Sequence, residues 1–250
     1  MIELNKVYNE DCVSFMEKLD DSSISLMICD PPYGIAKKKP LKGKSHGNIQ
    51  TLSEDWDIFD SKEKYLEFSR QWISESKRIL KESGSILVYG TRESIFDMKS
   101  LLDETGMKFI DMITWVKRDA PPNVSRRGYA HSTEFILWYC NGDKDWTFNH
   151  DDLKKYNNGK QMRNYWDIQR SMTKDERTSH KTQKKIELGN IIVEAHSNKG
   201  ELVYIPFAGS GTEIESCIKL GRQWIATETK QEYIDEIIVP RINKLWIKNK

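Results

Sequence analysis

Apolar residues along the chain follow two patterns that take turns from one terminus to the other. Short continuous apolar runs, such as residues 23–29, are typical of buried strands. Stretches with apolar residues at every third or fourth position, such as residues 61–82, are typical of helices. The alternation of the two predicts the α/β class, with a mostly parallel sheet covered by helices on both faces.

The same patterns indicate where the individual elements lie. Strands are predicted at residues 23–29, 85–90, 109–117, 133–140, 201–206 and 222–228. Helices are predicted at residues 13–19, 61 to about 82, 95–102, 186–195, 212–220 and from 231 onward. Because glycine favours helix ends, Gly84 and Gly106 are expected to close the second and third helices.

Two polar segments, residues 34–60 and 118–180, follow neither pattern. Loops of this length in a compact domain are usually functional or disordered. Both segments contain basic residues and aromatics, which favours a ligand-facing surface. We therefore expect a single domain over residues 1–250 in which these two segments face a ligand.

Composition narrows the class of protein. A mean hydropathy of −0.68 indicates a soluble globular chain, and no apolar run approaches the ~20 residues of a membrane helix. The N-terminus lacks a secretory signal, so we expect a cytoplasmic location and no membrane partner. The four cysteines form no C-x-x-C pair, which argues against a zinc site or a disulfide framework. Since the net charge is only +1, any nucleic-acid surface must be local.

The stretch "LVYIPFAGSGTEIESCIKLGRQWIATET", residues 202–229, predicts a strand, a glycine loop, a helix and a second strand. Gly209 and Gly211 would let the backbone approach a ligand, and Glu228 could accept hydrogen bonds from ribose hydroxyls. This arrangement is typical of a nucleoside-containing cofactor. Ile214 replaces the third glycine of the dinucleotide pattern, which weakens an NAD interpretation. A tight turn that merely requires glycine is the structural alternative.

The sequence "DPPY", residues 30–33, follows the buried strand at 23–29. Ligands of open α/β sheets bind outside the carboxyl ends of strands, so Asp30 and the glycine loop could border one crevice. The Asp30 carboxylate and the Pro31 carbonyl could hold the hydrogens of one aromatic amine while Tyr33 stacks on its ring. The electrophile that suits this crevice is the methyl group of S-adenosylmethionine. A rigid turn without chemistry is the alternative.

The chain resembles the β-class DNA amino-methyltransferases. "DPPY" precedes "PFAGSGT", which is the permuted motif order of that class, and blocks such as "SKRILKESGSILVYG" and "SHKTQKKIEL" occur in family order. The resemblance covers nearly the whole chain. It implies a Rossmann-like methyltransferase fold with a twisted, mostly parallel sheet of seven strands. It also implies that the target base is flipped into the site.

The resemblance assigns roles to individual positions. The catalytic loop would be Asp30, Pro31, Pro32 and Tyr33. S-adenosylmethionine would contact Asp11 and Cys12 at its adenine, Glu228 at its ribose, Thr182, Gln183 and Lys184 at its carboxylate, and Phe207, Gly209, Ser210, Gly211 and Thr212 on its methionine side. Asp30 is also expected to contact the cofactor. Two positions depart from the family. Ile205 replaces a frequent aspartate, which predicts lower cofactor affinity, and Lys185 replaces a frequent proline.

The resemblance implies methylation of the N6 amine of a flipped-out adenine in double-stranded DNA, because within this family an aspartate at the head of the "DPPY" tetrad is commoner in adenine enzymes. The resemblance to small methyltransferases of GATC restriction systems favours a GATC target and a cognate restriction endonuclease, and it admits a homodimer. Target recognition is expected within residues 141–179. DNA contacts are expected from Lys37, Lys38, Lys39, Lys42, Lys44, Arg126, Arg127 and Arg163.

Other interpretations remain open at this point. An N4-cytosine DNA methyltransferase, an RNA adenine methyltransferase or a protein glutamine methyltransferase would keep the chemistry and change the substrate. An NAD-binding oxidoreductase or an inactive DNA-binding module would belong to a different class. His131 and His180 are interpreted as loop-packing residues rather than as bases or metal ligands.

Overall fold

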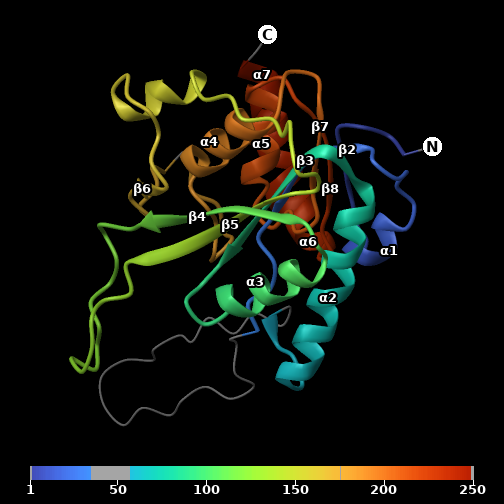
Figure 1. The fold of residues 1–250 in the computed structure, drawn as a ribbon. Helices are drawn as coiled ribbons and strands as arrows, with labels where there is room; N and C mark the ends of the chain where they lie inside the picture. The colour runs from blue at the N-terminus through green and yellow to red at the C-terminus, as the bar shows by residue number, and fades with distance from the viewer. Residues whose placement is uncertain (1, 35–56, 175, 249–250) are drawn as a thin grey trace.

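Strands and helices alternate along the chain and form one twisted sheet with helices on both faces (Figure 1). The computed structural model describes residues 2–34, 57–174 and 176–248. The α/β class expected from the apolar pattern is confirmed. The five lysines between residues 37 and 44, which we expect to contact DNA, lie outside the described residues. Within the described ranges, no helix combines the length and the apolar character needed to cross a membrane.

The described residues form one eight-stranded sheet in the order β1-β8-β7-β2-β3-β5-β4-β6. Among the described strands, only β5 runs antiparallel to its neighbours, β3 and β4. The strands are β1 (Lys6–Tyr8), β2 (Ile24–Cys29), β3 (Leu80–Gly90), β4 (Lys108–Val116), β5 (Thr133–Cys140), β6 (Tyr165–Asp167), β7 (Leu202–Ile205) and β8 (Gln223–Thr227).

The described sheet has one strand more than the seven expected. The apolar pattern missed β1 and β6, because three residues are too short to show a period. Both strands extend the edges of the sheet, since β1 pairs with β8 and β6 pairs with β4. The predicted strand at residues 133–140 coincides with β5.

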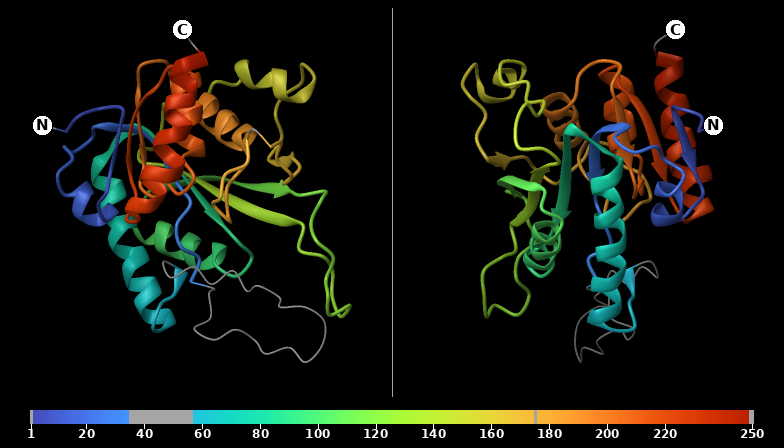
Figure 2. Two further views of the ribbon diagram at one scale, coloured as in Figure 1. Left: turned by 180° about the vertical axis from the view of Figure 1, so that it is seen from behind. Right: turned by 45° about the vertical axis from the view of Figure 1, so that its right-hand side comes forward.

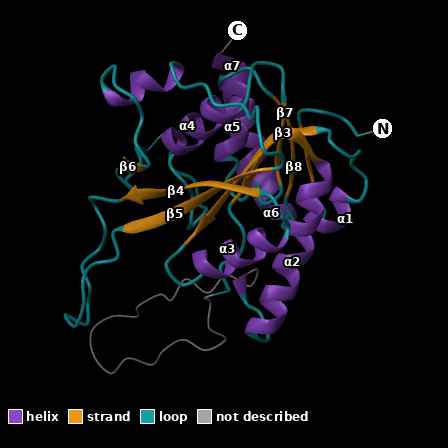
Figure 3. Cartoon of the chain, viewed as in Figure 1, coloured by secondary structure: helices purple, strands orange, loops and turns teal. Residues whose placement is uncertain are grey.

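Two layers of helices cover the sheet (Figure 2 and Figure 3). The helices are α1 (Cys12–Met16), α2 (Lys62–Ile79), α3 (Ile95–Glu104), α4 (Ile186–His196), α5 (Thr212–Lys219), α6 (Gln231–Tyr233) and α7 (Val239–Lys248), with a 3₁₀ turn, η2 (Asp152–Asn157), and a π turn, η3 (Ile234–Ile238). One apolar core lies beneath α1, α2 and α3, and a second lies beneath α4, α5 and η3.

Side chains of the central strand β2 pack alternately into these two cores. Leu26 and Ile28 point into the core beneath α4 and α5, whereas Met27 and Cys29 point into the core beneath α1 and α2. A strand buried on both faces is therefore apolar at nearly every position, with Ser25 as the exception in β2, and this explains the apolar run that predicted the strand. All four cysteines of the chain are buried and unpaired.

The boundary between α2 and β3 differs from the prediction. The helix ends at Ile79 rather than near Glu82, and Leu80 already has an extended backbone with ψ 135°. Gly84 therefore lies inside β3, where the register against β2 shifts. A Cβ at Gly84 would lie 2.9 Å from the Lys81 carbonyl oxygen, so this glycine serves an irregular strand instead of a helix end.

The order of the strands creates a switch point at the centre of the sheet. From β2 the chain continues to its neighbour β3 on one side, and from β7 it continues to β8 on the other side. Since β2, β7 and β8 are parallel, their carboxyl ends open at one edge. Such a position is where open α/β sheets bind ligands.

Candidate functional site

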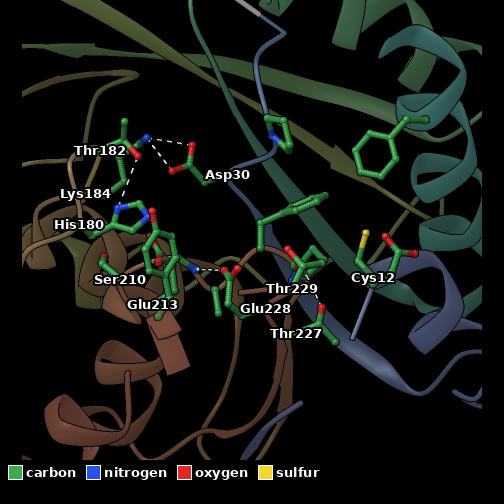
Figure 4. Close-up of a pocket in the computed structure, with 18 of the residues that line it drawn as sticks. Cys12, Asp30, His180, Thr182, Lys184, Ser210, Glu213, Thr227, Glu228 and Thr229 are labelled. Carbon is green, nitrogen blue, oxygen red and sulfur yellow. Dashed lines mark hydrogen bonds and ion pairs between the residues drawn. The ribbon is translucent and has the colours of Figure 1, made fainter. Parts of the chain in front are cut away.

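A cavity of about 310 Å³ opens at this edge of the sheet (Figure 4). Its size falls in the range of small-molecule sites, which is roughly 300–1,000 Å³. Asp30 after β2, the loop after β7 and Glu228 after β8 all line the cavity. The two sequence motifs therefore do border one crevice, as expected from parallel strands that end at the same edge.

Most residues that the resemblance assigned to the cofactor or to the catalytic loop line this cavity, but some do not. The lining includes Asp11, Cys12, Asp30, Pro32, Thr182, Lys184, Phe207, Gly209, Ser210 and Glu228. It does not include Pro31, Tyr33, Gln183, Gly211 or Thr212. The Gln183 amide instead bonds to Thr178 and to the Glu176 carbonyl, so it holds the loop before α4.

The glycine loop has the conformation that its sequence requires. Gly209 has φ 49° and Gly211 has φ 71°, and both values lie in the left-handed region that favours glycine. A Cβ at Gly209 would lie 3.3 Å from Nε2 of His180, so a side chain there would narrow the cavity. The loop thus presents backbone to a ligand.

Glu228 fastens this loop from the neighbouring strand. One carboxylate oxygen accepts from the N–H of Gly209 and the other from the N–H of Lys230, both at 2.9 Å. Burial raises the pKa of the Glu228 carboxyl, while these N–H groups act in the opposite direction. A carboxylate in this position can accept further hydrogen bonds from ligand hydroxyls.

An apolar recess forms the far side of the cavity. Phe59, Phe68 and Phe207 line it, and the rings of Phe68 and Phe207 meet edge to face at a centroid distance of 6.4 Å. Asp11 stands at its border and caps α1 by accepting from the N–H groups of Val13 and Ser14. Apolar walls beside a polar border suit an aromatic base, so the residues present fit a nucleoside cofactor.

Asp30 is held by a buried lysine. Nζ of Lys184 lies 2.8 and 2.7 Å from the two carboxylate oxygens of Asp30, and the Tyr33 hydroxyl donates to Asp30 at 2.5 Å. Burial alone would lower the pKa of Lys184, but the carboxylates of Asp30 and Glu134 raise it above its usual value. Lys184 is therefore a fixed cation beside the Asp30 carboxylate.

Glu134 stands behind this lysine. It is the second residue of β5. Its carboxylate accepts a hydrogen bond from Nζ of Lys117 at 2.8 Å and lies 3.8 Å from Nζ of Lys184. Burial acts to raise the pKa of Glu134, but the two lysines lower it below its usual value. The row Lys117, Glu134, Lys184 and Asp30 thus alternates in charge from the sheet to the cavity.

Asp57 fixes the other end of the "DPPY" loop. Its carboxylate oxygen accepts from the N–H of Tyr33 at 2.6 Å and from the N–H of Gly34 at 2.8 Å, and its side chain is buried. The tetrad is therefore clamped between Asp57 at its backbone and Lys184 at its leading carboxylate.

Sequence reasoning missed several residues of the site. His180 lines the cavity and packs edge-on against Tyr233, so its packing role was expected but its place in the cavity was not. Glu213 also lines the cavity, and its signal in the sequence is an acid on the helix face that buries Ser216 and Cys217. Nothing in the sequence indicates the role of Asp57, because a single acid in a polar segment matches no motif.

The two departures from the family pattern have simple structural settings. Ile205 is buried in the core at the end of β7, so this strand end carries no acid. Lys185 has φ −72°, a value that proline shares, and its Nζ donates to the Ser171 carbonyl. The lower cofactor affinity predicted from Ile205 stays a prediction.

The three arginines expected to contact DNA are exposed. Arg126 and Arg127 lie in the connection between β4 and β5, which extends beyond the sheet (Figure 1). Arg163 precedes β6 and lies over the ring of Tyr165, with 5.7 Å between the guanidinium carbon and the ring centroid. Their contact with DNA stays a prediction.

Comparison with known proteins identifies relatives over most of the chain. A family model described as DNA methylase matches residues 24–239. The Type II methyltransferase M2.MboI of Moraxella bovis is 32% identical, over 92% of this chain and 84% of the relative. The Type II methyltransferase M2.DpnII of Streptococcus pneumoniae is 34% identical, over 90% of this chain and 85% of the relative.

Solved structures agree with the fold. The M1.HpyAVI–SAM complex superposes with a TM-score of 0.70 at 27% identity and covers 95% of this chain and 98% of its own. The PvuII cytosine-N4-specific DNA methyltransferase superposes with a TM-score of 0.74, over 94% of this chain and 85% of its own. Since the latter is only 18% identical, it supports the fold alone.

Proposed function

Because the chain belongs to the N6/N4 DNA methylase family, we propose that it transfers a methyl group from S-adenosylmethionine to the N6 amine of adenine in double-stranded DNA. The observation that carries this proposal is that the Asp30 carboxylate and the Gly209 loop open into one cavity. The loop proposed to bind the cofactor and the proposed acceptor for the target amine therefore border the same cavity. The protein is an S-adenosylmethionine-dependent DNA methyltransferase.

Different cavity residues would contact different parts of the cofactor. Asp11, Cys12 and the phenylalanine recess would hold its adenine, and Glu228 would accept from its ribose hydroxyls. The Gly209 loop would approach its methionine side. When bound, S-adenosylmethionine supplies the electrophilic methyl group.

Asp30 acts on the amine that receives the methyl group. A carboxylate has about four acceptor positions, and Lys184 and Tyr33 use three of them in this structure. The remaining position can accept a hydrogen of the adenine amine and orient the nitrogen lone pair toward the methyl group. The interaction strengthens as the nitrogen gains positive charge, so it favours the transition state over the ground state.

Tyr33 and Lys184 keep this acceptor in place. Burial and the neighbouring Asp30 raise the pKa of the Tyr33 hydroxyl, so Tyr33 remains a donor to Asp30. Lys184 stays charged because the carboxylates around it raise its pKa. The orientation of Asp30 is therefore set before substrate arrives.

The choice of adenine over cytosine rests on Asp30 at the head of the tetrad. Nucleosides from DNA treated with the protein and S-adenosylmethionine should contain N6-methyladenine when analysed by mass spectrometry. N4-methylcytosine without N6-methyladenine would contradict the assignment. Competition among duplex DNA, single-stranded DNA, RNA and protein should favour duplex DNA.

The proposal extends to a restriction–modification system and a GATC target, since the curated relatives are Type II methyltransferases. A restriction endonuclease for the same site and a second copy of the chain are the proposed partners. Recognition is assigned to residues 141–179, and Arg126, Arg127 and Arg163 would contact phosphates. Sequencing of methylated DNA from expressing cells should place the modified adenines in GATC, and another motif would contradict this target.

A further inference from the structure

Glu213 is a buried acid that the proposed mechanism does not use. It is the second residue of α5, its side chain is 6% exposed, and it lines the cavity. Among the residues that the structure describes, its Oε1 atom has no hydrogen-bond partner. A buried polar atom without a partner is costly, so its retention at a cavity wall points to a ligand that supplies the donor.

The charged groups around Glu213 are occupied elsewhere. Lys184, from the segment before α4, donates to Asp30 and to the Tyr33 hydroxyl. Arg241, from α7, donates to the Thr212 hydroxyl at 2.8 Å and lies 3.3 Å from Glu215. Neither cation donates a hydrogen bond to Oε1 of Glu213.

The remaining titratable neighbours add no positive charge. Asp30 at the end of β2, Tyr89 of β3 and Cys217 of α5 all interact electrostatically with Glu213. Burial, with Asp30, raises the pKa of Glu213 to about 7, although Lys184 and Arg241 act to lower it. The cavity is lined by four carboxyl side chains, those of Asp11, Asp30, Glu213 and Glu228, and by one lysine, Lys184. It therefore suits a ligand that brings positive charge.

We infer that Glu213 binds the α-ammonium group of the methionine moiety of S-adenosylmethionine. The inference rests on the proposed function, which provides the cofactor. An ammonium group carries three N–H donors, whereas the sulfonium centre and the carboxylate have none, so within the methionine moiety only the ammonium can donate a hydrogen bond to Oε1. The pairing also assigns the ammonium to Glu213 and leaves Asp30 for the target amine.

The position of Glu213 along the cavity agrees with this assignment. In Figure 4, Cys12 lies at one end of the cavity, Glu228 lies between, and Ser210 and Glu213 lie at the opposite end. An adenine at Cys12 and a ribose at Glu228 would direct the amino-acid end of the cofactor toward Glu213. The helix that carries Glu213 begins directly after the glycine loop.

The test compares two ligands that differ in the amino-acid moiety. S-adenosylhomocysteine carries the α-ammonium, and 5′-methylthioadenosine lacks it. Calorimetric titration of Glu213→Gln at pH 7.5 should show S-adenosylhomocysteine bound about tenfold more weakly than by the wild type. The affinity for 5′-methylthioadenosine should stay unchanged, which also shows that the variant is folded.

Glu215→Gln is the matched control. Glu215 lies on the same helix, pairs with Lys219 and Arg241, and is not among the residues lining the cavity. This variant should bind both ligands as the wild type does. An equal loss of both ligands in Glu213→Gln, or no loss of either, would overturn the inference.

A second measurement uses the wild type alone. Pairing with an ammonium favours the charged form of Glu213, so binding should release a proton below pH 7. Affinity for S-adenosylhomocysteine should rise about tenfold per pH unit between pH 5.5 and 6.5 and level off above pH 7. The affinity for 5′-methylthioadenosine should not show this rise with pH. Identical pH profiles for the two ligands would overturn the inference. If the wild type bound neither ligand, the proposed function would fail, and the inference with it.

Discussion

Lys184 donates to both carboxylate oxygens of Asp30, although 154 residues separate the two in the sequence. The lysine side chain is 6% exposed and that of Asp30 is 23% exposed, so little solvent screens the pair. The contact joins the segment before α4 to the loop after β2. It suggests that Lys184 positions the catalytic carboxylate, whereas the family resemblance assigned it to the cofactor carboxylate.

Lys184→Met distinguishes these two roles. Methionine keeps much of the length and removes the charge, so Asp30 should lose its orientation. We expect turnover to fall about 100-fold while the dissociation constant for S-adenosylhomocysteine changes little. Lys184→Arg, which retains a donor and the charge, should recover part of the turnover. A large loss of cofactor affinity with little loss of turnover would instead support the cofactor role.

Asp57→Ala tests the backbone clamp on the tetrad. Without the carboxylate, the N–H groups of Tyr33 and Gly34 lose their acceptor. Turnover should fall about tenfold or more, because the loop that carries Asp30 loses its fixed geometry. Asp57→Asn keeps one oxygen as an acceptor and should retain most of the activity. Equal turnover by Asp57→Ala and the wild type would show that the clamp is dispensable.

Glu228→Ala should act on binding rather than on chemistry. The substitution removes the proposed ribose acceptor and releases the N–H of Gly209. Loss of a charged hydrogen-bonding group corresponds to about 1.5–3 kcal/mol, so the affinity for S-adenosylhomocysteine should fall about 10- to 150-fold. Turnover at saturating cofactor should change much less. Unchanged affinity in calorimetry would remove Glu228 from the nucleoside site.

Buried His196 should make the fold sensitive to acid. Burial lowers its pKa to about 3, and its ring packs on Trp138 at a centroid distance of 4.4 Å. Unfolded histidine takes up a proton below pH about 6.5, but the folded one does so only near pH 3. Its contribution to stability is therefore complete above pH about 6.5 and is lost as pH falls, by about 1.4 kcal/mol per pH unit.

His196→Phe keeps the aromatic ring and removes this titration. Urea denaturation at pH 7, 6 and 5 should show a smaller loss of unfolding free energy with falling pH than in the wild type. His131→Gln, at an exposed histidine, should keep the wild-type slope. Parallel slopes for the wild type and His196→Phe would contradict the assignment.

Sequence alone predicted the parts of the site that depend on strand ends. Asp30 and Glu228 follow continuous apolar runs, and parallel strands end at one edge, so their meeting could be inferred without coordinates. Lys184, Glu134 and Asp57 could not be connected in this way. Their contacts depend on how loops return across the sheet, and no periodic pattern encodes that.

The fold shows the same division. Long elements with a clear apolar pattern, such as β5 and α4, lie within one residue of their predicted bounds. The short edge strands β1 and β6 were not predicted, because they form by pairing with β8 and β4 and their own residues show no pattern. The end of α2 was misplaced because an apolar residue such as Leu80 fits both a helix face and a strand. Pairing of Leu80 with Ile24 of β2 favours the strand.

The central claim is that Asp30 activates the target amine inside a cofactor cavity. Single-turnover transfer of tritiated methyl groups to DNA by Asp30→Asn, measured beside calorimetric binding of S-adenosylhomocysteine, tests it most directly. Asparagine keeps the shape of Asp30 but removes its charge, so transfer should fall by about two to three orders of magnitude while cofactor affinity stays within a few fold. Near-normal methyl transfer by Asp30→Asn and also by Asp30→Ala would contradict the claim.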